Sequence, residues 1–477
     1  MIARHLLKTT LSLSIVLGAS LGGTAARAET LADALVSAYR HSGLIEKNRA
    51  VLRAADEDVA IALSSLRPIV DYTANLQRTW TFPNDREIPS ANPAVVPPRR
   101  IDNSAETTTS IGISADLLLW DGGATQLGVD VAKELVLATR QGLVSVEQQV
   151  LLNGVAAYLG VREAIAFVNL RESNVSLISE QLRAANERFE VGEVTRTDVA
   201  VAEASLAAAR STLAAARGDL EQARANYVRF VGRKPGNLAA VSQLPPLPAS
   251  LAAAEAVARK THPDILRSMR LVTVADLNVA RAETSIKPRI TGRASVSIGD
   301  DFEEQASVGV AMTGPIYRGG RLTAAYRQAV AQRDETRADL HISTDNVFQD
   351  LAQAYALLEV ARARIRSGQL EVRAAELAFR SVQEEVRFGT RTTLDILDSE
   401  QDLQDARANL ISARISEIQA AYQVLTGMGL MTVDHLNLNV VTYDPSAYYN
   451  AVRTAPIRKV SPQGQKLDLL LKSLGKN

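Results

Sequence analysis

The 477-residue sequence contains no cysteine, and aromatic side chains make up only 4% of it. A chain without cysteine forms no disulfide, so its packed core or its association with other chains must hold it together. Beyond residue 28 no stretch reaches 18 apolar residues free of charge, which predicts that no helix spans a membrane. Nucleic-acid binding is disfavoured as well, because the basic and acidic residues are equal in number, at 53 each.

The sequence also lacks the patterns of a catalytic or metal-binding site. Residues 123–128 have the glycine spacing of a phosphate-binding loop but lack the Lys and Ser or Thr that should follow. The histidines are scattered, with no pair at the zinc-ligand spacing of a helix: His5, His41, His262, His341 and His435. We therefore expect neither an enzyme, nor a bound metal, nor a cofactor.

Residues 1–28 are predicted to be a signal peptide. Arg4 and Lys8 precede a short apolar segment, and Ala26-Arg27-Ala28 is a small-x-small cleavage site before Glu29. The apolar segment is too short for a membrane-spanning helix, which needs about 20 residues. The chain that remains has a net charge of −3 and no cysteine to carry a lipid anchor. It is expected to be either a periplasmic protein or an outer-membrane β-structure.

An internal repeat organises the rest of the sequence. Residues 31–34 and 65–68 recur as 251–254 and 285–288, both at an offset of 220. The Gly-Gly pair at 122–123 and the segment 192–199 recur as 319–320 and 389–396, both at an offset of 197. These offsets predict a first structural repeat at 29–232, a linker at 233–250 and a second repeat at 251–430. The C-terminal extension, 431–477, is expected to be loosely ordered, and the alternative is a short packed helix at 467–474.

Each repeat contains two segments in which apolar and polar residues alternate, which predicts four strands. The apolar positions are Val70, Tyr72, Ala74 and Leu76, then Ile111, Ile113, Ala115 and Leu117, then Ile290, Ala294, Val296 and Ile298, then Val308 and Val310. Strands of this length suit a tilted bilayer crossing, and aromatic residues cluster at both ends of the runs, as in the girdles of membrane barrels: Tyr72, Trp120 and Tyr317, then Trp80, Phe82 and Phe302. Alternation alone also fits a soluble β-sandwich. A proline-rich loop at 83–98 joins the first two strands, and a short turn at 299–305 joins the last two.

The remaining segments are predicted to be helical. Residues 124–190 and 321–388 contain no proline and little glycine, so each is expected to form one helix of about 100 Å. The helices that follow carry leucines seven residues apart, each with an alanine three residues on. This pattern predicts coiled-coil packing in both repeats: Leu206, Leu213, Leu220, Ala209, Ala216 and Ala223, then Leu403, Leu410, Ala406, Ala413 and Ala420.

Four strands cannot close a barrel, and open strand edges do not persist in lipid. Three copies would supply about 12 strands, which is within the range of outer-membrane barrels. The predicted fold is therefore mainly α with a small β part. It is a trimeric channel-tunnel with four transmembrane strands per chain in a shared 12-stranded barrel, and its long coiled-coil helices lie in the periplasm.

In this order, and in both copies, the doubled glycines and the Gly-x-x-Thr-x-x-Asp turns resemble those of the TolC family of outer-membrane factors over residues 31–429. Residues 387–398 resemble members that serve type I protein secretion and drug efflux. The resemblance implies a homotrimer in the outer membrane that receives secreted proteins, small toxic compounds or both. It also implies a periplasmic adaptor (a membrane fusion protein) and an inner-membrane ABC or proton-driven transporter as partners. The cargo and the identity of those partners stay open.

The alternatives are a non-channel periplasmic adaptor and a structural coiled-coil protein. An adaptor should contain a single copy of its helical hairpin, whereas this sequence is doubled. A filament would not need four alternating strands at equivalent points of two repeats.

The two turns that join the long helices to the returning helices carry the candidate functional residues. Gly192 and Gly389 are expected to adopt positive φ angles, which lets each helix stop and reverse. Thr195 and Thr392 are expected to cap the returning helices. Acidic residues three positions later, Asp198 and Asp395, would complete a capping-box arrangement.

The resemblance implies a further role for these turns. Thr197, Asp198 and Arg391 match positions that hold the pore entrance closed. Threefold symmetry would place Asp395 and Asp398 in a ring of six carboxylates that favours cations. The alternative is a set of solvated charges that only cap helices. Val386 departs from the family pattern, which often has a tyrosine there, and valine cannot donate a hydrogen bond to the closure.

Overall fold

The computed structural model describes residues 28–82, 87–88, 94, 99–100, 104–241, 243–454, 466 and 469. The predicted signal peptide up to residue 27 lies outside these residues. So do most of the proline-rich loop at 83–98 and, apart from residue 469, the alternative helix at 467–474.

The elements follow one another in two similar series. The first comprises α3 (Leu31–His41), α4 (Gly43–Ser64), β1 (Ile69–Thr81), β4 (Ser104–Trp120), α5 (Ala124–Glu190) and α6 (Arg196–Val231). The second comprises α7 (Leu251–Thr261), α8 (Pro263–Thr284), β5 (Arg289–Ile298), β6 (Glu304–Thr313), α9 (Arg321–Arg387) and α10 (Thr393–Gly427). Corresponding helices have equal or nearly equal lengths, with 67 residues in both α5 and α9. The predicted long helices are therefore confirmed to within one residue at their ends.

Among the described residues, four minor elements lie outside these series. Strands β2 (Glu87–Ile88) and β3 (Arg99–Arg100) pair with each other within the connection between β1 and β4. A single 3-10 turn, η1 (Asp300–Phe302), joins β5 to β6, as expected for the short turn of the second repeat. Helix α11 (Pro445–Val452) follows the second series.

The chain divides into two compact units, and α4, α5 and α9 each contribute to both. One comprises 1–46, 145–262 and 347–441, and contains the helical hairpins with their tips. The other comprises 47–144, 263–346 and 442–477, and contains the sheet.

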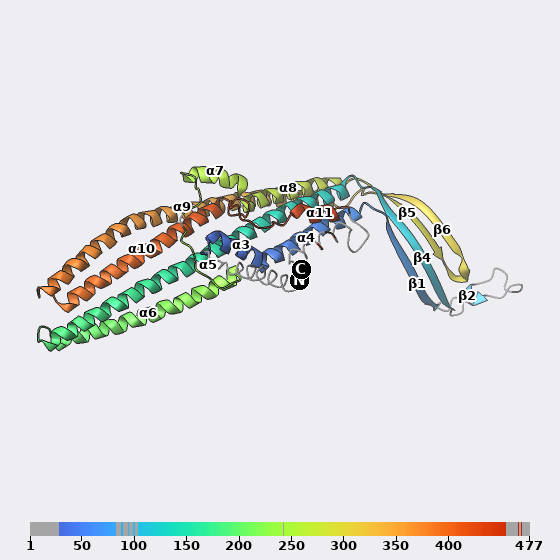
Figure 1. Ribbon diagram of the computed structural model, residues 1–477. Helices are drawn as coiled ribbons and strands as arrows, with labels where there is room; N and C mark the ends of the chain where they lie inside the picture. Colours follow the sequence, from blue (N-terminus) through green and yellow to red (C-terminus); the bar gives the residue numbers. More distant parts are fainter. Residues whose placement is uncertain are drawn as a thin grey trace, which may run out of the picture. The chain divides into compact units, whose positions relative to one another are not determined.

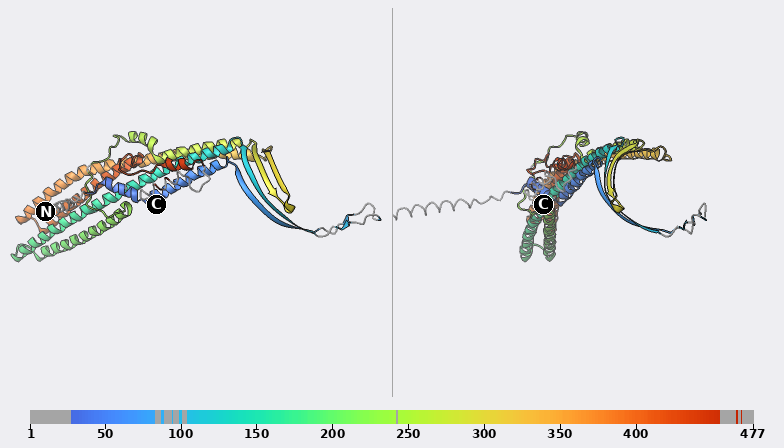
Figure 2. Two further views of the ribbon diagram at one scale, coloured as in Figure 1. Left: turned by 45° about the vertical axis from the view of Figure 1, so that its right-hand side comes forward. Right: turned by 90° about the vertical axis from the view of Figure 1, so that its right-hand side faces the viewer.

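The four long strands form one antiparallel sheet in the order β1-β4-β5-β6, and the sheet is curved (Figure 2). Among the described residues, β1 and β6 are the outer strands, and each is paired along one edge only. The β1–β4 hairpin is the longer one, because β1 and β4 pair as far as Thr81 and Ser104 whereas pairing of β4 with β5 starts at Ile111.

The register places all the predicted apolar positions on one face of the sheet. Val70 is opposite Ala115, Ala115 is opposite Ala294, and Ala294 is opposite Val308. The other face is polar, with an ion pair between Arg293 and Asp116 at 3.7 Å and a hydrogen bond between Ser295 and Ser307 at 2.8 Å. Every residue of β1 and β6 is exposed in the single chain. An amphipathic sheet whose apolar face is uncovered needs another apolar medium on that face.

The C-terminal extension is more ordered than predicted, as far as residue 454. Its α11 segment packs on α4 and α5, where Tyr443 and Tyr449 contact the buried cluster of Leu52, Val59 and Val136. Two arginines stack on these tyrosines at 5.4 Å from the ring centres, Arg49 on Tyr443 and Arg140 on Tyr449. The expectation of loose order is therefore wrong for this segment, because two planar side chains and two cationic groups hold it in place.

In the unit that holds the tips, α6 runs back along α5 and α10 runs back along α9 (Figure 1). The predicted seam is buried in both returning helices, with Leu206, Leu213 and Leu220 in α6 and Leu403, Ala406 and Ala413 in α10. The burial of these leucines and alanines agrees with the coiled-coil prediction, although Ala223 and Leu410 of the predicted seam are only partly buried.

Two helices, α5 and α6, are long and apolar enough by length and composition to cross a membrane. The sequence predicted no such helix, because that prediction counted only stretches of 18 apolar residues without any charge. Helices α5 and α6 qualify when up to two charged residues are allowed in the stretch. Half of the apolar window of α5 is already buried against other parts of the chain. Length and composition do not distinguish a membrane span from a packed helix of this kind.

Candidate functional site: the helix-tip turns

The first tip turn joins α5 to α6 through residues 191–195. Gly192 has a φ of 81°, and its N–H donates to the carbonyl of Phe189 at 3.0 Å. The N–H of Glu193 donates to the carbonyl of Arg188 at 2.9 Å. These bonds satisfy carbonyls that the end of α5 would otherwise leave without donors, and a residue with a side chain would be strained at this φ.

Thr195 and Asp198 then start α6 with a capping box. The Thr195 hydroxyl accepts from the N–H of Asp198 at 3.3 Å, and the Asp198 carboxylate accepts from the N–H of Thr195 at 2.8 Å. Hydrogen bonds from the Thr195 side chain and backbone lower the pKa of Asp198 below its ordinary value. The carboxylate is therefore ionised at the positive end of the helix dipole.

The second tip turn, between α9 and α10, repeats this geometry. Gly389 has a φ of 75°, and its N–H donates to the carbonyl of Val386 at 3.1 Å. Thr392 caps α10, and the Asp395 carboxylate accepts from the N–H of Thr392 at 2.8 Å. Bonds from the backbone and hydroxyl of Thr392, helped by the charge of Arg391, lower the pKa of Asp395. The predicted positive φ angles and capping boxes are confirmed at both tips.

Arg391 lies within its own turn and has two acidic neighbours there. Its Nε donates to Glu385 Oε2 at 3.1 Å, and its Nη1 lies 3.6 Å from Asp395 Oδ1. Over the part of the chain that the structure describes, no ion pair joins Arg391 to Asp198. The sequence analysis did not predict a role for Glu385, which lies six residues before Arg391 at the end of α9.

The other candidate residues are solvent-facing in the single chain. Thr197 and Asp398 are exposed, while Asp198 and Asp395 are partly buried. The structure therefore brings Asp395 and Arg391 together on the second tip, whereas Asp198 is bonded to Thr195 on the first tip.

Above the tips, all four helices contribute to one apolar core, which we call the tip cluster. It consists of Ile178 and Ala185 of α5, Ala202, Leu206 and Ala209 of α6, Phe379 and Val386 of α9, and Ile396, Leu397 and Leu403 of α10. Val386 is thus an apolar contact within the cluster. Its lack of a hydrogen-bonding group is consistent with this place.

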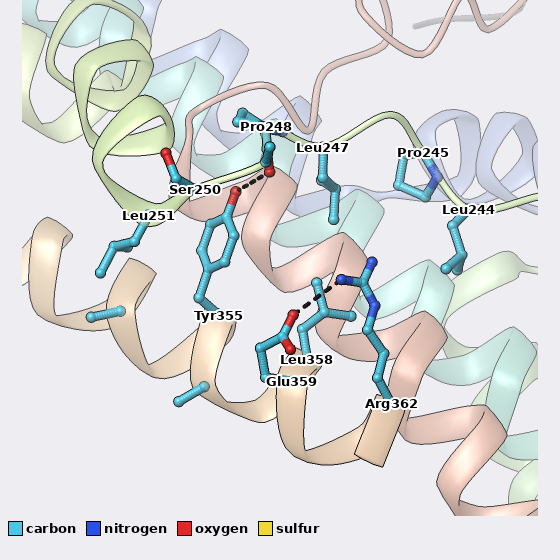
Figure 3. A pocket seen from close by; sticks show the side chains of 13 residues that line it. Leu244, Pro245, Leu247, Pro248, Ser250, Leu251, Tyr355, Leu358, Glu359 and Arg362 are labelled. Carbon is cyan, nitrogen blue, oxygen red and sulfur yellow. Dashed lines mark hydrogen bonds and ion pairs between the residues drawn. The ribbon is translucent and has the colours of Figure 1, made fainter. Parts of the chain in front are cut away.

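A cavity of about 600 Å³ lies elsewhere in the same unit, where the linker crosses α9 (Figure 3). The Tyr355 hydroxyl donates to the carbonyl of Pro248 at 3.0 Å and ties the linker to the helix. The charged groups of the lining, Glu359 and Arg362, pair with each other at 3.1 Å. Because its charges are mutually satisfied and its other walls are mainly apolar, the cavity resembles a packing gap more than a reaction site.

Within the described residues, no group of three or more His, Cys, Asp or Glu side chains could hold a metal ion. The tips remain the strongest candidate for a functional site, since they combine ionised carboxylates, an arginine and glycines of positive φ in matching turns.

Comparison with known proteins gives one consistent result. The profile of the family described as "Outer membrane efflux protein" matches residues 34–233 and 256–429. The chain is 37% identical over 455 residues to the outer membrane efflux protein BepC of Brucella suis biovar 1 (strain 1330), covering 94% of this chain and 96% of BepC. It is 27% identical over 434 residues to the proteases secretion protein PrtF of Dickeya chrysanthemi, covering 86% and 89%. The fold is similar to that of the Campylobacter jejuni CmeC outer membrane channel, with a TM-score of 0.71 at 17% identity, covering 89% of each chain.

Proposed function

The chain belongs to the outer membrane efflux protein family, and from this premise we propose that three copies form the outer-membrane exit duct of a tripartite export system. The predicted mainly helical fold with a small β part is confirmed, and it is the fold of trimeric outer-membrane channel-tunnels such as CmeC. Family membership also confirms the outer membrane as the location, with the helical part in the periplasm.

The observation that carries the proposal is the amphipathic sheet with two open edges. In a ring of three chains, β6 of one chain pairs with β1 of the next, which gives 12 strands and leaves no edge in lipid. The apolar face that contains Val70, Ala115, Ala294 and Val308 then contacts lipid. The polar face, with Arg293 and Asp116, lines the pore.

The cargo and partners follow from the relatives by analogy. BepC is named for efflux and PrtF for protease secretion, so this duct passes small toxic compounds, secreted proteins or both. A periplasmic adaptor joins it to an inner-membrane ABC or proton-driven transporter, which supplies the energy. The chain itself carries out no catalysis, in keeping with a family of channels.

The boundaries of the mature chain belong to the same proposal. Cleavage after residue 28 leaves repeats at 29–232 and 251–430 with the linker 233–250 between them. The equal helix lengths of the two series support this division.

The tips close the duct in this proposal. Asp198 and Thr197 of one hairpin face Arg391 of the neighbouring hairpin, while Asp395 and Asp398 of three chains surround the entrance. The pairing of Arg391 with Glu385 inside its own turn supports a rebuilt closure, in which Glu385 orients the arginine. Exposed ion pairs contribute about 0–1 kcal/mol each, so a closure of three such contacts stays within reach of a docking partner.

Single-channel conductance in a planar bilayer tests both parts of the proposal. We expect a small conductance for the wild-type trimer and a severalfold larger one for Asp198→Ala combined with Arg391→Ala, because the double variant removes both sides of the closure. The matched control is Arg210→Ala combined with Asp219→Ala, which removes the same two charges from exposed positions of α6 and should leave the conductance small. Equal conductance in all three proteins would show that other residues close the duct. A folded trimer without any conductance would refute the duct itself.

A further inference from the structure

One carboxyl group near the tips is buried without any hydrogen-bond partner. Glu400 of α10 is 1% exposed, and neither of its carboxylate oxygens has a partner. It lies eight residues after the cap of α10, about 12 Å along the helix from the second tip turn. Buried carboxyl groups are normally hydrogen-bonded or paired with a cation, so this one requires an explanation.

Glu400 lies on a side of α10 that is buried near the tip, whereas the corresponding side of α6 is exposed. The offset of 197 makes Glu203 of α6 its counterpart, and Glu203 is exposed. Close to its tip, α10 buries a second row of residues that has no equivalent in α6: Thr393, Leu397, Glu400 and Gln404. Their spacing of four, three and four residues puts them on one side of the helix. Helix α10 contacts α6, and Leu397 of this row belongs to the tip cluster, to which both hairpins contribute.

The surroundings of Glu400 offer no charge to balance it. Its neighbours along α10 are Ile396, Leu397 and Leu403, all members of the tip cluster. Gln404, one turn further on, is also buried, and its side-chain oxygen likewise has no donor. Most charged side chains at the tip end of the four helices are exposed at the surface: Glu180, Arg183 and Glu187 of α5, Glu203 of α6, Arg380 and Glu384 of α9, and Asp398 and Asp402 of α10. Arg407, seven residues after Glu400 on α10, is partly buried and is paired with Glu376 of α9 at 2.8 Å. The capping carboxylates Asp198 and Asp395 are also partly buried. Burial alone raises the pKa of Glu400 to about 7.

We propose that Glu400 is a proton-dependent latch between the two hairpins, a positioning residue for the closure of the duct. With its proton, the neutral carboxyl stays in the tip cluster and α10 remains packed on α6. When the proton is released to water, the carboxylate gains hydration only if α10 moves away from α6. The latch deepens the proposed function and rests on it, since it assigns to the same tips a dependence on periplasmic pH.

The direction of the pH effect follows from the two environments. An exposed glutamate titrates near its ordinary value of 4.5, and the packed one near 7. Packing of the hairpins is therefore favoured most below about pH 4.5, and the preference falls as the pH rises toward 7. The full difference corresponds to a factor of about 300 in the packing equilibrium of each chain.

The test compares full-length wild-type, Glu400→Gln and Glu203→Gln trimers. The open fraction of single channels is recorded between pH 5 and pH 8. We expect the wild-type and Glu203→Gln channels to open at least tenfold more often at pH 8 than at pH 5. Glu400→Gln should stay mostly closed throughout, because a neutral amide of the same shape never ionises. If Glu400→Gln keeps the wild-type pH profile, the pH response belongs to other carboxyl groups, such as Asp398, and the latch is refuted.

A second measurement follows the distance between the two hairpins and does not depend on channel current. Because the chain has no cysteine of its own, spin labels would attach only to introduced cysteines. These cysteines replace the exposed residues Ala204 of α6 and Gln401 of α10. The labelled chains are diluted with unlabelled ones, so that the measured distance joins the two labels of one chain. This distance should lengthen from pH 5 to pH 8 in wild type and remain short in Glu400→Gln.

The two measurements separate the possible failures. A distance that responds to pH in channels that never conduct would support the latch and refute the duct. Conducting channels whose label distance is the same at both pH values would support the duct and refute the latch.

Discussion

At the scale of single residues, two acids stand out because burial raises the pKa of each. Both Asp56 and Glu400 are almost completely buried and lack hydrogen-bond partners for their carboxylate oxygens. They differ in their neighbours, since the charge of Arg140 acts on Asp56 whereas only burial acts on Glu400. An unpartnered buried acid costs stability when it is ionised, so each marks a place where substitution should have a measurable effect.

Asp56→Asn should stabilise the protein at neutral pH. Burial raises the pKa of Asp56 from 3.8 to about 6, despite the opposing charge of Arg140. The folded state therefore holds this proton more tightly than the unfolded state, and the stability that it contributes is lost as the pH rises from about 4 to 6. Thermal unfolding of the asparagine variant should occur a few degrees higher than that of wild type at pH 8, with a smaller difference at pH 4.5.

The matched control for this variant is Asp58→Asn, two residues away on the exposed side of α4. It should change the unfolding temperature little at either pH. A variant of Asp56 that is destabilised at pH 8 would show that the attraction of Arg140 outweighs the cost of burial.

At the scale of elements, the tip turns could be predicted from the sequence and the packing around them could not. Glycine followed by threonine and aspartate at fixed spacing specifies a helix stop and a capping box from local chemistry alone. Glu203 and Glu400 occupy equivalent positions in the two repeats, so no local pattern distinguishes the exposed residue from the buried one. That difference arises only when one hairpin packs against the other.

The same limit explains the C-terminal extension. Helix α11 has only eight residues, and its place depends on Arg49 and Arg140, which lie hundreds of residues earlier in the chain. A contact of this kind leaves no periodic pattern in the sequence.

Thr392→Ala should loosen the second tip without unfolding the molecule. The substitution removes the hydroxyl that accepts from the N–H of Asp395, and an N-cap of this kind contributes about 1 kcal/mol. Amide hydrogens at the start of α10 should then exchange about fivefold faster, as measured by mass spectrometry. Thr392→Ser keeps the hydroxyl and should exchange like wild type. Unchanged exchange in the alanine variant would mean that contacts with other chains, and not the cap, hold this turn.

At the scale of the whole molecule, the sequence predicted the doubled layout and the need for partner chains, since four strands leave two edges open. The structure adds the register, which gathers the apolar positions of all four strands on one face. It thereby explains how a chain of nearly balanced charge can insert a sheet into a bilayer while its other face stays polar. In the proposed trimer, β1 of one chain pairs with β6 of another and the ring closes at three chains.

Disulfide cross-linking between those two strands tests the pairing and the number of chains in the ring. Thr73 of β1 is replaced by cysteine in combination with cysteine at one of Gln305, Ser307, Gly309 or Ala311 of β6, all on the polar face. Within one chain, β1 and β6 are three strand spacings apart, about 14 Å, which a disulfide cannot bridge. Oxidation in membranes should therefore link different chains at one or two of the four positions. The cross-linked species should contain two or three chains and no more. Cross-linked species of more than three chains, or no cross-link at any position in a folded protein, would contradict the closed barrel of three chains.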